Sequence, residues 1–134
     1  CACIAFMPPS ETPATVDPFH HRALRASMGA AFRLPILTDE PVAPLVSRLK
    51  NLGYLTAGLT GRGEARLPEL DPRRPTALFF GSEGSGLDAA SLAEMDVRVR
   101  IPIRPEVESL GVAAAAAVAF FWLHLASRNG DLPH

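Results

Sequence analysis

The chain has 134 residues, of which 48% are hydrophobic and 20% are charged, so it is expected to fold as one domain over residues 1–134. Its two cysteines exclude a disulfide framework and favour a reduced, cytoplasmic protein, and no apolar run reaches the roughly 20 residues of a membrane helix. A formal net charge of −1 gives no indication of binding to nucleic acid, whose phosphates attract strongly basic proteins.

The first part of the chain is predicted to alternate between short strands and helices. The apolar residues 1–7 predict a strand, and Asp17 is expected to cap a helix that ends near Met28. Residues 32–37 predict a second strand. Apolar residues at helical spacing mark 42–52 as an amphipathic helix, and residues 54–59 predict the next strand.

The second part continues this alternation. Residues 68–75 are too polar and too rich in proline to form an element, whereas the apolar residues 77–80 predict a buried strand. Asp88 is expected to cap a short helix that ends near Met95, and residues 97–101 predict another strand. The last helix, 111–127, has almost no polar face and is expected to be buried. The pattern as a whole predicts an α/β fold with helices flanking a parallel sheet.

Three loops follow predicted strands, at residues 60–64, at 81–86 and after Ile101. Ligands of parallel α/β sheets bind beyond the carboxyl ends of the strands, so these loops are expected to form one small-molecule pocket. The glycines at 81, 84 and 86 match neither a phosphate-binding loop nor a dinucleotide fingerprint, so an ordinary turn remains an alternative. The cysteines and the four histidines show no ligand spacing, and no metal is expected.

Three sequence segments, read together, point to a family. They are FGSEGSGL at 80–87, IPIRPEVESLGV at 101–112, and DPFHHRA at 17–23 with RASMGA at 25–30. They resemble, in order and spacing, segments of the SpoU/TrmH family of RNA ribose 2′-O-methyltransferases, within the SPOUT superfamily. The resemblance implies S-adenosylmethionine as cofactor, rRNA or tRNA as substrate, a C-terminal deep trefoil knot, and a homodimer whose interface includes the last helix.

The resemblance also implies roles for individual residues. Glu83 and Ser109 are expected at the active site, where Ser109 would also contact the cofactor. Arg22 and Arg25, three residues apart on one helix face, are candidates for RNA binding, although an ordinary solvated face is the alternative. The other expected cofactor contacts are Leu59, Thr60, Gly81, Gly84, Ile101, Ile103 and Leu110.

The sequence departs from the family pattern in two places. The family's first motif, an Asn followed by an Arg, has no match before Asp17, so the front of the domain is expected to be missing from this sequence. Gly111 stands where the family usually has Asn. Two alternatives therefore stay open: a SPOUT domain that binds RNA or cofactor without turnover, and an unrelated nucleotide-binding α/β module.

Overall fold

A computed structural model describes residues 3–6, 18–37, 40–82, 84–104, 106–107 and 109–128. Five strands form one parallel sheet in the order β1-β4-β2-β5-β3. This arrangement confirms the predicted parallel α/β fold. The strands are β1 (Cys3–Phe6), β2 (Leu55–Leu59), β3 (Ala65–Arg66), β4 (Thr76–Phe80) and β5 (Val97–Arg100).

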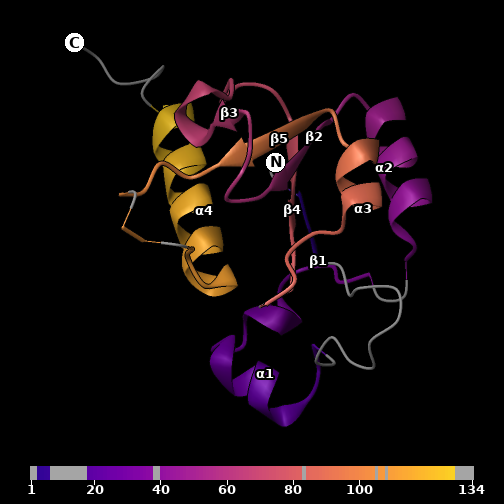
Figure 1. The fold of residues 1–134 in the computed structure, drawn as a ribbon. Coiled ribbons are helices and arrows are strands. Elements are labelled where there is room, and N and C mark those ends of the chain that lie inside the picture. Colours follow the sequence, from indigo (N-terminus) through magenta and orange to yellow (C-terminus); the bar gives the residue numbers. More distant parts are fainter. Residues whose placement is uncertain are drawn as a thin grey trace.

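Helices cover both faces of the sheet, as Figure 1 shows, with α4 on one side and α2 and α3 on the other. The short helix α1 lies apart, at the lower end of the molecule in Figure 1. The described part of the chain has no helix long and apolar enough to cross a membrane. The α-helices are α1 (His21–Ala26), α2 (Val42–Asn51), α3 (Ala89–Glu94) and α4 (Val112–Arg128), and the 3-10 helices are η1 (Ala30–Phe32) and η2 (Leu67–Glu69).

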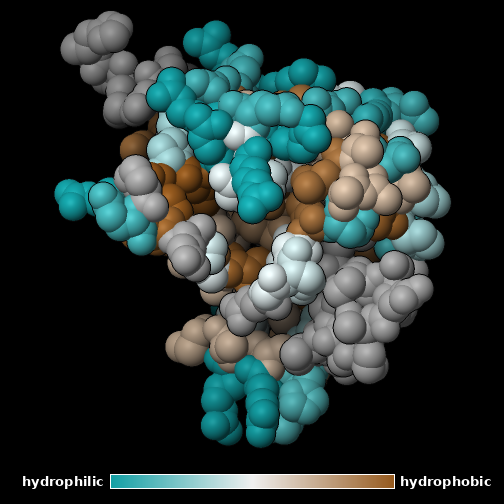
Figure 2. All heavy atoms as spheres, viewed as in Figure 1, coloured by the Kyte–Doolittle hydropathy of each residue, from teal (hydrophilic) through white to brown (hydrophobic). Residues whose placement is uncertain are grey.

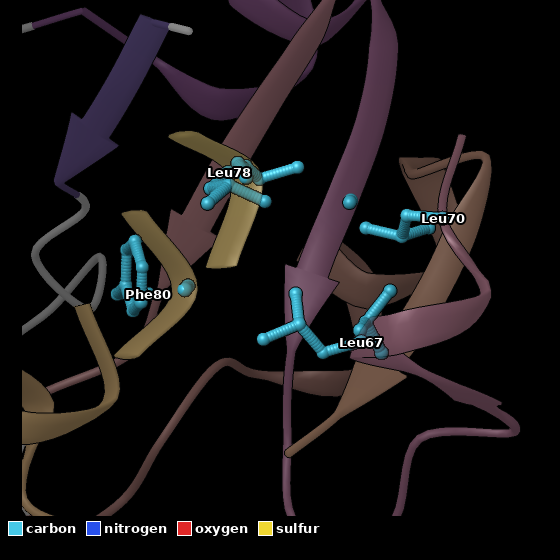
Figure 3. Packing of buried hydrophobic residues seen from close by; sticks show 8 residues of the cluster. Leu67, Leu70, Leu78 and Phe80 are labelled. Carbon is cyan, nitrogen blue, oxygen red and sulfur yellow. The ribbon is translucent and has the colours of Figure 1, made fainter. Parts of the chain in front are cut away.

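Strand β4 is the centre of the core because all five of its residues are buried. Successive side chains of a strand point to opposite faces, so this one strand contributes to two clusters. Leu78 and Phe80 pack on the α4 side, where Figure 3 shows them together with Leu67 and Leu70. Ala77 and Phe79 pack on the side of α2 and α3. Full burial of Phe79 alone contributes about 2 to 3 kcal/mol relative to leaving it exposed.

Helix α4 begins and ends close to its predicted bounds, but it is buried along one side only. Ala119 and Leu123 contact the core, whereas Val118, Phe121 and Leu125 are 42%, 68% and 47% exposed. The expectation of a fully buried helix is therefore wrong for this single chain. An apolar side of a 17-residue helix faces away from the sheet.

Two further expectations about elements need correction. Residues 33–37 form no strand, because Pro35 cannot donate a ladder hydrogen bond and Phe32 and Leu37 are 72% and 70% exposed, outside the sheet. The first helix begins at His21 and not near Pro18, and the His20 ring, acting as N-cap, accepts a hydrogen bond from Arg22 N at 3.3 Å. The expected cap, Asp17, lies outside the described residues.

The segment after β2 holds two elements that the sequence pattern does not predict. Strand β3 has only two residues, too few for any periodicity, and it pairs with β5 through Ala65 and Val99. Helix η2 follows at once, and its Leu67 is buried in the core. Glu69 accepts hydrogen bonds from the backbone and side chain of Arg66, which lowers the pKa of Glu69.

Candidate functional site

A cavity of about 540 Å³ lies at one edge of the sheet, between three loops and the start of α4. Strands β2, β4 and β5 are mutually parallel neighbours, so the loops that follow them, residues 60–64, 81–87 and 101–111, leave the sheet at the same edge. A cavity of this size can hold a ligand as large as a nucleoside with a side chain. The lining consists of Leu59, Thr60, Gly61, Phe80, Gly81, Ser82, Gly84, Ser85, Gly86, Val99, Ile101, Ile103, Ser109, Leu110, Gly111, Val112 and Ala115.

The loop after β4 turns back tightly on itself. Gly86 N donates to Ser82 O at 3.0 Å, and the Ser82 and Ser85 hydroxyl oxygens are 2.6 Å apart. A Cβ at Gly81 would lie 2.0 Å from the carbonyl carbon of Gly86, so only glycine fits there. Gly84 has φ +100°, and no atom lies within 4 Å of a Cβ built on it. The glycines thus allow backbone amides to line the cavity directly.

The loop after β2 is fixed to strand β5 by hydrogen bonds. Thr60 N donates to Val99 O at 2.9 Å. The guanidinium of Arg100 donates to the backbone oxygens of Gly63, at 2.5 Å, and Glu64, at 3.1 Å. A Cβ at Gly63 would lie 2.4 Å from the carbonyl carbon of Val99, so the two backbones pack without a side chain between them. Arg100 therefore holds one wall of the cavity in place without lining it.

Arg98 of β5 and Glu64 of the loop after β2 form an exposed ion pair. The pair contributes little to stability because water screens both partners.

The third wall is the segment that enters α4. Ile101 and Ile103 follow β5, and Ser109 and Leu110 precede the helix, whose first turn is closed by Ala115 N donating to Gly111 O at 2.9 Å. Ser109 is exposed in this wall, so its hydroxyl is available to a ligand.

Two carboxylates stabilise elements that support the site, Asp88 beside the loop 81–87 and Asp96 at the opposite end of β5. Hydrogen bonds from the Ser91 side chain and backbone lower the pKa of Asp88, which caps α3 after the loop 81–87. Asp96 joins β5 to its neighbour: desolvation raises its pKa, but hydrogen bonds from Thr56 and Lys50 outweigh this, and the net pKa is lowered. Both carboxylates stay charged at neutral pH as structural acceptors.

The lining carries hydroxyls, amides and apolar side chains but no ionisable group among its described residues. Such a site favours a ligand with an apolar planar part and a few polar atoms that amides can recognise. No group of three or more His, Cys, Asp or Glu side chains in the described part of the chain could hold a metal ion.

The structure brings most of the predicted site residues together. All the predicted cofactor contacts, from Leu59 to Leu110, line this one cavity. Glu83 lies outside the described residues, between Ser82 and Gly84 in the loop after β4. Arg22 and Arg25 lie on α1 and do not line the cavity.

Gly61, Ser82 and Ser85 also line the cavity, although the sequence pattern did not predict them as ligand contacts. Their position inside the same two loops was the signal that could have identified them.

A second cavity, of about 430 Å³, opens at the opposite edge of the sheet. It lies where β4 begins, and Arg73, Arg74 and His124 contribute to its lining. In parallel sheets ligands bind at the other edge, so the cavity between the three loops is the candidate functional site.

The profile of the SpoU rRNA Methylase family matches residues 10–121. An uncharacterized tRNA/rRNA methyltransferase of Mycobacterium tuberculosis H37Rv is 41% identical over 109 residues, covering 78% of this chain and 38% of its own length. The 23S rRNA (guanosine(2553)-2′-O)-methyltransferase RlmP of Bacillus subtilis is 33% identical over 109 residues, covering 81% of this chain and 44% of its own length. The chain thus spans less than half the length of these relatives.

Solved structures show the same fold. An RNA 2′-O ribose methyltransferase superposes with a TM-score of 0.75 at 26% identity, covering 94% of this chain and 46% of the other. The SpoU methyltransferase AviRb from Streptomyces viridochromogenes, solved in complex with AdoMet, superposes with a TM-score of 0.73 at 26% identity, covering 96% of this chain and 49% of the other.

Proposed function

Because this chain belongs to the SpoU rRNA methylase family, we propose that it forms the cofactor-binding part of an enzyme that methylates a ribose 2′-hydroxyl in rRNA or tRNA. The observation that carries the proposal is the cavity between the loops after β2, β4 and β5. Its neutral, amide-rich walls suit a nucleoside cofactor, and its position at the carboxyl edge of a parallel sheet is the usual one for such ligands.

S-adenosylmethionine is the proposed cofactor, in keeping with AviRb, which was solved with AdoMet. Leu59 and Ile101 provide apolar surface for the adenine, and the backbone near Gly81, Ile103 and Leu110 provides donors and acceptors for its polar atoms. No atom lies within 4 Å of a Cβ at Gly61 or Gly84, so the glycine loops leave room for a ligand at both positions. The bound cofactor supplies the activated methyl group and its own leaving group.

The protein's own residues position the ribose that accepts the methyl group and the RNA around it. The hydroxyl of Ser109, exposed in the cavity wall, is placed to hydrogen-bond the ribose that accepts the methyl group. Glu83, in the loop after β4, is proposed to orient the target nucleotide or an arginine supplied by the family's first motif. Arg22 and Arg25 on α1 are proposed to contact RNA phosphates.

The same proposal includes the finer features of the fold. We propose that residues 101–111 and the other two loops form a trefoil knot at the entry to α4; the proposal is supported by all three loops lining one cavity together with the start of α4. We also propose a homodimer, since Val118, Phe121 and Leu125 leave an apolar side of α4 exposed. Figure 2 shows hydrophobic surface in this region of the molecule. The proposed location is the cytoplasm, with the RNA substrates.

A methyl-transfer assay tests the function directly. The protein is incubated with tritiated S-adenosylmethionine and bulk RNA, and the RNA is then hydrolysed in alkali, which cannot cleave beside a 2′-O-methylated ribose. Label in alkali-resistant dinucleotides is the expected result, and label in mononucleotides would show base methylation and contradict the proposal. Ser109→Ala should lower kcat by a larger factor than it weakens the affinity for the cofactor.

A second candidate, cofactor binding without turnover, is favoured by Gly111, which lines the cavity where the family resemblance expects Asn. Calorimetric binding of S-adenosylmethionine together with methyl transfer at background level would support it. In that case Gly111→Asn is the informative variant, because a restored amide should raise turnover without changing the dissociation constant of the cofactor.

A further inference from the structure

Residues 18–37, called here the basic-aromatic segment, have a composition unlike the rest of the chain. They contain three arginines, Arg22, Arg25 and Arg33, and no aspartate or glutamate, although the whole chain has a net charge of −1. The same segment contains two phenylalanines, Phe19 and Phe32, and two histidines, His20 and His21. Positive charge combined with aromatic rings is the composition of surfaces that bind single-stranded nucleic acid.

The aromatic side chains of this segment lie at the surface in pairs. Phe32 is 72% exposed, and its ring centroid lies 6.5 Å from that of Phe19, with the planes tilted by 41°. The rings of His20 and His21 are 4.2 Å apart, and both residues are exposed. Exposed, tilted ring pairs leave faces on which further planar groups can stack.

The positive charges of the segment are not neutralised by carboxylates within the described part of the chain. Arg22, Arg25 and Arg33 are exposed and take part in none of its ion pairs, whereas Arg48, Arg66 and Arg98 each have an acidic partner. In Figure 2 hydrophilic side chains project from the lower end of the molecule, where α1 lies. This surface is therefore complementary to a polyanion.

The segment also lies at the correct end of the molecule for an RNA that reaches the candidate site. It follows β1, which runs parallel to β4 with Phe6 beside Phe80, immediately before the loop 81–87. Figure 1 draws α1 and η1 beyond this end of β4. Nucleotides on either side of one held at the cavity can thus extend toward the segment.

We propose that the basic-aromatic segment is a binding platform for single-stranded RNA, on which unpaired bases next to the target nucleotide stack against Phe32 while the arginines bind the adjoining phosphates. The inference rests on the proposed function and narrows its substrate to an unpaired stretch of RNA. A duplex fits poorly, because its bases are already stacked and its major groove is too deep and narrow for side chains. A second copy of this chain would bind this surface less favourably, because two such segments would repel each other through three uncompensated positive charges each.

The test measures fluorescence anisotropy of a labelled single-stranded RNA of about 12 nucleotides, and of the same strand annealed to its complement. Phe32→Leu keeps an apolar side chain of similar size but removes the ring; Leu52→Ala, which shortens an apolar side chain that is 67% exposed at the end of α2, is the control. Arg33→Gln is paired in the same way with Arg128→Gln, at the far end of α4. Cofactor affinity is measured for every variant by calorimetry.

We expect Phe32→Leu to weaken single-strand binding by about fivefold or more and Leu52→Ala to leave it unchanged. Arg33→Gln should reduce the slope of log affinity against log salt by about 0.7, the value for one phosphate contact on a single strand. Cofactor affinity should stay constant throughout, and the duplex should bind more weakly than the single strand.

Unchanged single-strand affinity in Phe32→Leu overturns the inference, as does an equal loss for single strand and duplex. A shift of Phe32→Leu to a smaller species in sedimentation, with RNA affinity intact, would assign the surface to contacts between copies and also overturn it. Failure of the proposed function has a different signature, namely absence of methyl transfer and of cofactor binding in the unmodified protein. The two ideas can therefore fail separately.

Discussion

The substitution Gly81→Ala gives the sharpest test of the candidate site, because the structure fixes what the added methyl group meets. The new Cβ would lie 2.0 Å from the carbonyl carbon of Gly86 and 2.2 Å from the nitrogen of Leu87. Ordinary van der Waals contact begins at 3.4 Å, so the two sides of the loop must separate by 3.4 − 2.0 = 1.4 Å. Both neighbours are backbone atoms, and no side chain can rotate away to accommodate the methyl group.

Opening the loop disturbs the cavity more than it disturbs the fold. It breaks the hydrogen bond from Gly86 N to Ser82 O, which contributes about 0.5 to 1.5 kcal/mol. A displacement near 1 Å at a site that positions reactants can lower the rate by about 100-fold. We therefore expect Gly81→Ala to raise the dissociation constant of S-adenosylmethionine at least tenfold and to lower methyl transfer further, at a modest cost in stability.

The assay is calorimetry with S-adenosylmethionine, accompanied by thermal unfolding. Gly53→Ala is the control: Gly53 has φ +83° and no neighbour within 4 Å of its Cβ position, and it precedes β2, at the edge opposite the cavity. That change should cost about 1 to 2 kcal/mol of stability through backbone strain and leave cofactor affinity unchanged. An unaltered dissociation constant in Gly81→Ala, or an equal loss in both variants, would refute the reasoning.

Three further substitutions test the surroundings of the site. Arg100→Met removes the donor to the backbone oxygens of Gly63 and Glu64, so cofactor affinity in calorimetry should fall by about 1 kcal/mol, whereas loss of stability alone would contradict this. Asp96→Asn should lower the free energy of unfolding by about 1 to 3 kcal/mol at pH 7. Because the pKa of Asp96 is lowered from an ordinary value of 3.8, denaturant titrations should show this difference disappearing as the pH falls below that value; a constant difference would be inconsistent. Phe121→Asp should convert the proposed dimer to monomer in sedimentation, and an unchanged mass would argue against an α4 interface.

Most of the fold could be predicted from the sequence because its elements have strong local signals. Strand β4 is a run of apolar residues that is buried on both faces, and such runs are typical of the centre of a parallel sheet. Helix α3 begins where Asp88 was expected to cap it, with Asp88 accepting from Ser91 N at 2.8 Å. In both cases local chemistry and tertiary structure favour the same conformation.

The errors occurred where a local pattern had no matching tertiary partner. Phe32, Leu34 and Ile36 alternate as they would in a half-buried strand, yet they pair with neither edge strand of the sheet, and Pro35 removes a donor. Strand β3 is the opposite case, since two residues carry no pattern and their extended form depends on pairing with β5. Sequence periodicity could not distinguish a strand that pairs from one that does not.

The candidate site could be predicted only in part, and the limit has a physical cause. That the loops after three parallel strands share an edge follows from sheet geometry, which is why the predicted cofactor contacts meet in one cavity. These particular loops are neighbours because β2 lies between β4 and β5. This strand order depends on pairing between segments that are distant in sequence. Arg98 and Arg100 are two residues apart in β5 and so lie on one face of the strand, but they have different roles. Arg100 donates hydrogen bonds to backbone oxygens of the loop after β2, whereas Arg98 forms a surface ion pair with Glu64. A shared face therefore did not imply a shared function.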